Sequence, residues 1–93
     1  MFSAGYKLLK SEADCRSRDE NLGDFPSIDE CADACRNKDE CKFFLYGIPE
    51  TNKESKCFWE KTVDGTCPNG WQDDKYNFYE LRSTYRFSNC QLL

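Results

Sequence analysis

The sequence predicts a small α+β domain in which disulfide bridges hold one helix against an antiparallel β-sheet. Three observations support this fold class. Seven cysteines occur in 93 residues, a content close to that of disulfide-stapled scaffolds. One segment has the apolar spacing of a helix, and several others are short, aromatic and strand-like. A chain of this length forms one domain with a limited core, so covalent staples are expected to add to its stability.

The N-terminal part is predicted to contain one short strand. Tyr6–Lys10 has the pattern of an edge strand. Residues 11–24 are polar and rich in turn-forming side chains, so we expect a loop there.

The clearest local signal is a helix over residues 28–38. Ser27 and Glu30 have the spacing of a capping box. Positions i, i+3, i+4 and i+7 of one helical face are occupied by Ile28, Cys31, Ala32 and Cys35. Because Cys31 and Cys35 share this face, both thiols are expected to point toward the sheet.

Three further strands are predicted after the helix. Residues 41–48 would present apolar side chains on both faces of a strand, which favours a central position in the sheet. Residues 57–63 form its antiparallel partner across a long hairpin loop. Residues 64–75 are expected to be a loop, and Tyr76–Leu81 the last strand.

The spacing of the cysteines does not select one disulfide pairing. Local structure makes a bridge from Cys35, at the end of the helix, to Cys41 plausible. Cys31 lies one helical turn earlier and can reach Cys57 at the start of the neighbouring strand. These arguments narrow the possible pairings but leave others open.

Several residues resemble a known family, the PAN/Apple module. The pattern consists of Cys31-x3-Cys35-x5-Cys41, then Phe44 and Tyr46, and then Cys57-x-Trp59. The resemblance covers about residues 6–81 and implies a helix cradled by a curved antiparallel sheet. The chain is also similar to cysteine-rich modules of microalgal and other protist proteins.

The resemblance also implies a disulfide pattern. It pairs Cys31 with Cys57 and Cys35 with Cys41. Apple modules bridge their first cysteine to their last, and Cys15 and Cys67 would fill that role here. Cys90 lies outside this pattern, so we expect it to be unpaired or to form an intermolecular bridge.

The cysteines also bear on domain limits and location. We predict an extension at residues 1–5, the PAN/Apple-like domain at residues 6–82 and a tail at residues 83–93.

Oxidised cysteines indicate the extracellular space or another oxidising lumen. The start lacks the pattern of a signal peptide, so we expect an excised portion of a longer precursor. No apolar run is long enough to span a membrane. The alternative is a reduced cytosolic protein.

Composition argues against catalysis and against nucleic acid binding. The chain has no histidine, so Ser-His and Cys-His nucleophilic pairs are absent. Adjacent carboxylates, Asp19/Glu20 and Asp73/Asp74, fit solvated turns better than an acid–base pair. The net charge is −4, whereas phosphate binding needs a concentrated basic surface. We therefore predict a protein that is not an enzyme.

Metal binding is also not expected, and no cofactor is predicted. The cysteines lack the second knuckle or the histidines of a structural zinc site. Residues 19–24 offer clustered oxygen ligands around a glycine, but they do not fit the EF-hand loop. We favour a tight acidic turn there over a calcium site.

The resemblance implies a non-catalytic module that binds a protein or a carbohydrate. The candidate ligand-binding side chains are three aromatic residues, Trp71, Tyr85 and Phe87. Trp71 could instead pack over the corner formed by Cys15 and Cys67. The alternative function is a small structural accessory subunit of a larger assembly, for example on the lumenal face of a membrane complex. Its tail and Cys90 would then be the docking elements.

Overall fold

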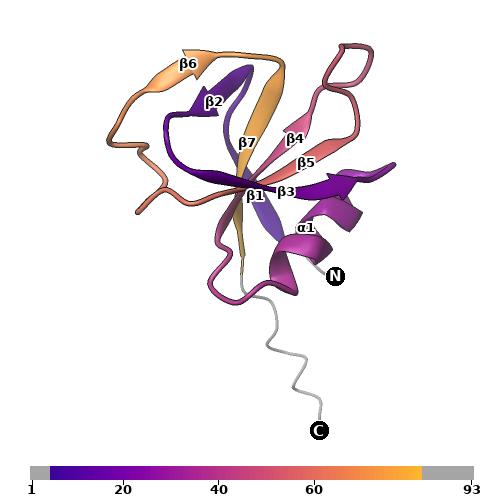
Figure 1. Ribbon diagram of the computed structural model, residues 1–93, viewed down its shortest axis with the longest axis horizontal. Coiled ribbons are helices and arrows are strands. Elements are labelled where there is room, and N and C mark those ends of the chain that lie inside the picture. Colours follow the sequence, from indigo (N-terminus) through magenta and orange to yellow (C-terminus); the bar gives the residue numbers. More distant parts are fainter. Residues whose placement is uncertain (1–4, 83–93) are drawn as a thin grey trace, which may run out of the picture.

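The computed structural model describes residues 5–82 (Figure 1). These residues form one helix, a five-stranded sheet and a two-stranded ribbon. The helix is α1 (Ile28–Arg36). The sheet contains β1 (Tyr6–Lys10), β3 (Asp19–Asp24), β4 (Phe43–Gly47), β5 (Lys56–Glu60) and β7 (Tyr76–Leu81), and the ribbon pairs β2 (Ala13–Cys15) with β6 (Trp71–Asp73). The predicted class, one helix packed on an antiparallel sheet in a small α+β domain, is confirmed.

The five-stranded sheet is antiparallel throughout and has the order β1-β7-β4-β5-β3. Strand β4 lies in the middle, and all five of its residues are buried. Its predicted central position and its antiparallel pairing with β5 are therefore confirmed. A strand that is apolar on both faces requires a cover on each side.

The helix and the ribbon provide these two covers on opposite sides of the sheet (Figure 1). The core on the helix side includes Cys31, Cys35, Phe44, Tyr46, Cys57 and Tyr79. The core on the ribbon side includes Cys15, Phe43, Leu45, Cys67, Tyr76 and Phe78. Successive residues of β4 thus alternate between the two cores, as the two-residue period of a strand requires.

Aromatic pairs connect neighbouring strands within each core. Phe44 stacks on Tyr79 with ring centroids 5.2 Å apart, and on the other face Phe43 stacks on Phe78 at 5.7 Å. Both pairs join β4 to β7, and cross-strand aromatic pairs of this kind stabilise a sheet. Tyr6 of β1 donates a hydrogen bond to Asp29 of α1 (2.6 Å), which fixes the helix against the edge of the sheet.

The helix begins where the capping box predicts and ends slightly earlier than expected. The Ser27 hydroxyl accepts a hydrogen bond from the Glu30 amide (3.2 Å). The α-helix stops at Arg36, and the Lys38 amide instead bonds to the Cys35 carbonyl three residues back (2.9 Å). This tighter final turn replaces the last two helical residues that the periodicity predicted.

Three strands were not predicted from the sequence. Residues 11–24 were expected to be a loop but contain β2 and β3, and residues 64–75 contain β6. These strands are short or polar, and pairing defines them: β3 pairs with β5, and β2 pairs with β6. The strand predicted at residues 57–63 begins at Lys56 and ends at Glu60. The strand predicted at residues 41–48 is confined to β4.

No helix among residues 5–82 is long and apolar enough to cross a membrane. The predicted N-terminal extension (residues 1–5) lies almost wholly outside the described part of the chain, and the predicted tail (residues 83–93) lies entirely outside it.

The turn after β4 generates the first testable prediction. A Cβ atom added to Gly47 would lie 1.6 Å from the carbonyl oxygen of Lys53. Neither the new Cβ atom nor the Lys53 carbonyl oxygen can move aside without a shift of the backbone. Gly47→Ala should therefore lower the free energy of unfolding, measured by urea denaturation, by roughly 2–4 kcal/mol. Gly65→Ala is the matched control, since its Cβ meets side chains rather than backbone: the flexible end of Leu9 at 2.8 Å and the Phe43 ring at 3.3 Å. Equal stability of the two variants would contradict the packing described for this turn.

Candidate functional site

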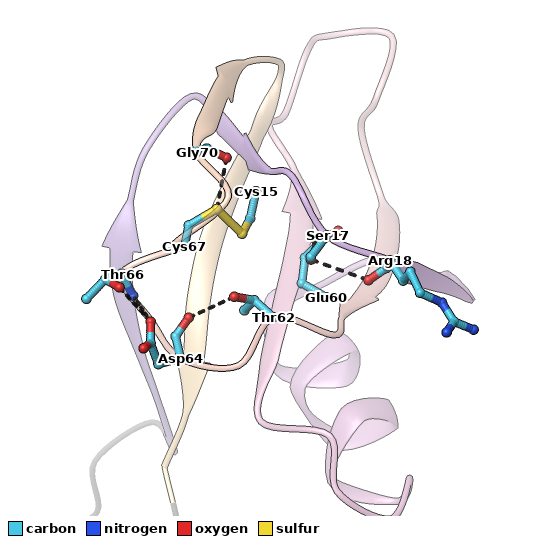
Figure 2. Close-up of a disulfide and its surroundings, with 9 residues drawn as sticks. All are labelled: Cys15, Ser17, Arg18, Glu60, Thr62, Asp64, Thr66, Cys67 and Gly70. Carbon is cyan, nitrogen blue, oxygen red and sulfur yellow. Dashed lines mark hydrogen bonds between the residues drawn. A yellow bond between two sulfur atoms is a disulfide. The ribbon is translucent and has the colours of Figure 1, made fainter.

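Three buried disulfides hold the layers together. They join Cys31 to Cys57, Cys35 to Cys41 and Cys15 to Cys67. The first attaches α1 to β5, the second connects the end of the helix to the segment before β4, and the third attaches β2 to the loop before β6 (Figure 2). These are the same pairs that the family resemblance implied. Three buried bridges are typical of a protein that folds in an oxidising, extracellular environment.

Trp71 is packed against the ribbon-side core rather than presented freely. It lies opposite Cys15 in the ribbon, and its ring meets the Phe78 ring edge-on at 4.9 Å. The Lys10 ammonium lies over the Trp71 ring, 5.7 Å from its centroid. This arrangement corresponds to the alternative in which Trp71 covers the Cys15–Cys67 corner. Of the other sequence candidates, Tyr85, Phe87 and Cys90 lie outside the described residues.

A groove that the sequence did not predict lies where β4 begins and β5 ends. We call it the sheet-end groove. It has a volume of about 450 Å³, and its lining includes Glu40, Lys42, Phe43, Trp59, Lys61 and Val63. Val63 is 84% exposed and, with Leu8, is one of two exposed large apolar side chains among residues 5–82. The groove therefore combines the apolar side chains of Phe43, Trp59 and Val63 with charged ones.

Electrostatic contacts organise one side of the sheet-end groove. The Lys61 ammonium lies 4.3 Å from the centroid of the Trp59 ring. Lys61 and Lys38 both pair with Glu20, at 3.2 and 2.7 Å. Hydrogen bonds from Lys38 and then Lys61 lower the pKa of the Glu20 carboxyl. Lys42 forms no ion pair within the described part of the chain, so its ammonium is available to a partner.

A second hollow, of about 500 Å³, lies beside the turn between β6 and β7. Its lining includes Glu12, Ile48, Thr51, Asp73, Asp74 and Lys75. Residues 5–82 contain no group of three or more His, Cys, Asp or Glu side chains that could hold a metal ion. The acidic segment 19–24, expected to be a turn, is strand β3 and pairs with β5 instead.

Among residues 5–82, one charged side chain lies in the core, that of Glu60, which the sequence did not single out. Glu60, the last residue of β5, is only 1% exposed. Its Oε1 atom accepts a hydrogen bond from the Ser17 hydroxyl (2.6 Å). Its Oε2 atom and the Oδ1 atom of Asp14 are both buried without a hydrogen-bond donor. The alternation of β5 was an available signal, because Glu60 lies two residues after Phe58, on the ribbon-facing side.

Burial and neighbouring acids raise the pKa values of Glu60 and Asp14. Burial raises the pKa of Glu60 to about 8; the Ser17 hydrogen bond opposes this rise, and the charges of Asp14 and Asp19 add to it. Burial also raises the pKa of Asp14, and the charges of Asp19 and Asp74 act in the same direction. This raised pKa favours the protonated, neutral form of Glu60 at neutral pH.

The fold and these surfaces define a small, disulfide-stapled α+β domain with exposed grooves. The family model of the PAN domain matches residues 6–90. Because this match spans most of the 93 residues, the chain belongs to the PAN domain family. PAN domains are generally modules that bind proteins or carbohydrates, and they are typically not catalytic. No curated protein and no solved structure matches the chain.

Glu60 generates a prediction about stability and pH. A free glutamate has a pKa of 4.5, whereas burial raises the pKa of Glu60 to about 8. Between these values the folded protein holds a proton that the unfolded chain has lost. The free energy of unfolding should therefore fall as pH rises from about 4.5 to 8, by up to about 1.4 kcal/mol per pH unit, and then level off. Urea denaturation at pH 5, 7 and 9 measures this slope.

The variant Glu60→Gln isolates this effect. The amide mimics a protonated carboxyl, since it can accept from Ser17 and donate to Asp14. The variant should remove most of the slope and should be more stable than the wild type at pH 9. Glu54→Gln, which changes an exposed carboxylate in the β4–β5 loop, is the control. A wild-type slope that persists in Glu60→Gln would mean that another group is responsible.

Proposed function

We propose that this PAN domain is a non-catalytic binding module that recognises a partner protein in an oxidising extracellular or lumenal compartment, and that its contact surface is the sheet-end groove. The observation that carries this proposal is the exposure of Val63 beside Phe43 and Trp59. Protein interfaces commonly combine apolar side chains with charged and polar ones.

The surroundings of the two tryptophans favour a protein over a carbohydrate. Sugar rings bind by stacking on an open aromatic face, whereas each tryptophan ring here has a lysine ammonium over it. Of the two lysines of the groove, Lys61 already pairs with Glu20. Lys42 adds an unpaired positive charge within the described residues. The expected partner surface therefore presents an aliphatic side chain with an acidic residue beside it.

The proposal is tested by site-specific crosslinking. A photoreactive phenylalanine at position 62, in the groove, should trap a secreted protein, and the same group at Lys7 on β1 should not. Val63→Glu should weaken this capture at least tenfold, because a bound partner would bury the new carboxylate beside Phe43 and Trp59. Lys42→Glu should weaken it through charge repulsion.

The matched control is Leu8→Glu, which changes another exposed apolar side chain (50% exposed) on β1, away from the groove. This variant should leave the capture unchanged. Binding of the wild-type domain to a glycan array tests the alternative, that the ligand is a carbohydrate. Glycan binding that survives Val63→Glu, or protein capture unaffected by Val63→Glu and Lys42→Glu, would overturn the assignment of the groove.

A further inference from the structure

We propose that the tail, residues 83–93, folds back over the sheet-end groove of its own chain, and that a partner protein has to displace it. The contact is made by Tyr85 and Phe87, which pack on Val63. This inference deepens the proposed function, because it names what covers the groove when no partner is bound. It rests on the proposed function only in treating the groove as a binding surface for a partner.

The described part of the chain ends beside the groove. The amide of Leu81, the last residue of β7, donates a hydrogen bond to the Lys42 carbonyl (2.7 Å). Glu80 lies opposite Phe43 in the antiparallel pair of β7 and β4. Lys42 and Phe43 both line the groove. Since β7 ends where β4 begins (Figure 1), Arg82 lies next to the groove and the tail is attached there.

The distance from this point to the far wall of the groove is short. The strand order β7-β4-β5 places Trp59, near the end of β5, two strand spacings from β7, which is about 10 Å. An extended chain advances about 3.3 Å per residue, so Tyr85 can reach about 10 Å from Arg82 and Phe87 about 16 Å. The tail is therefore long enough for both aromatic side chains to lie over the groove without any change in the sheet.

The apolar side chains of the tail complement those of the groove. Tyr85 and Phe87 are two positions apart, so an extended tail presents both on one side. Val63, which is 84% exposed, lines the groove together with Phe43. Packing an aromatic ring on an exposed aliphatic side chain is favourable, because both lose apolar surface to water. Val63 is therefore the expected contact of the two rings.

The charges of the tail fit the groove in part. The tail carries one cation, Arg86, and no acid, whereas the whole chain has a net charge of −4. Glu40 lines the groove, forms no ion pair among residues 5–82 and is available to Arg86. The tail offers no carboxylate to Lys42. A partner that places an acidic side chain against Lys42 gains a contact that the tail lacks, and this contact allows the partner to displace the tail.

Two further observations favour the tail of the same chain over a second copy. The match to the PAN domain family extends to residue 90 and so includes Tyr85 and Phe87 with the domain. In addition, a short attached segment has an effective concentration on the order of millimolar at a site that it can reach. A second copy in dilute solution does not reach that concentration, so the tail occupies the groove first.

Photocrosslinking within the purified full chain, with no partner present, tests this inference. A photoreactive phenylalanine at position 62, in the groove, should become linked mainly to peptides that contain Tyr85 or Phe87, with a yield independent of protein concentration. The matched control carries the same group at Lys7, which lies opposite Glu80 and is therefore also close to the end of β7. The yield at position 62 should exceed that at position 7 by about tenfold, and Phe87→Ser should remove most of this difference.

The methyl signals of Val63, the only valine in the sequence, provide a second measurement that needs no photoreactive group. An aromatic ring packed on a methyl group shifts the NMR signal of that methyl group. Phe87→Ser should therefore move the Val63 signals, whereas the control variant Ser88→Ala should leave them in place.

Equal crosslinking at positions 62 and 7, or Val63 signals that Phe87→Ser does not move, would overturn the inference. Crosslinks between isotopically distinct copies in a mixture would also overturn it, in favour of an interface between two copies. No partner takes part in either measurement. A failure to capture a partner, with the tail still linked to position 62, would therefore contradict only the proposed function.

Discussion

The burial of strand β4 on both faces is the constraint on which the rest of the structure depends. All five residues of β4 are buried, with Phe44 and Tyr46 facing the helix and Phe43 and Leu45 facing the ribbon. A domain of this size has too little chain to cover both faces with large elements. One nine-residue helix and a ribbon of two three-residue strands provide the covers. One disulfide attaches the helix to β5, and another joins β2 of the ribbon to the loop before β6.

The same constraint explains where the surface features lie. The two covers are short, so the sheet is incompletely covered at the end where β4 begins and β5 stops, and the sheet-end groove opens there. The ribbon approaches the sheet closely enough to enclose Glu60, which would otherwise be solvated at the end of a strand. Burying a carboxyl group without a cationic partner is unfavourable unless it stays neutral. The packing of the two covers therefore accounts for both the sheet-end groove and the buried, protonated Glu60.

The sequence predicted those elements whose signals are local. The capping box and the spacing of Cys31 and Cys35 located the helix, and the apolar run around Phe44 located the central strand. The three missed strands are polar or three residues long, and partners distant in the chain define them. Glu60 and the sheet-end groove were missed for the same reason, since burial and grooves arise from tertiary packing. The sequence left open whether Trp71 contacts a ligand or packs on the core. Its contact with Phe78 became visible only in the structure.

Non-reducing peptide mapping of the intact protein tests the central claim most directly, because the two covers depend on their staples. The account predicts linked peptides for Cys31–Cys57, Cys35–Cys41 and Cys15–Cys67. Alkylation before reduction should then label none of these six residues. Free thiols at these positions, or a bridge that pairs Cys15 with Cys90, would contradict the arrangement in which the ribbon is fixed over the second face of β4.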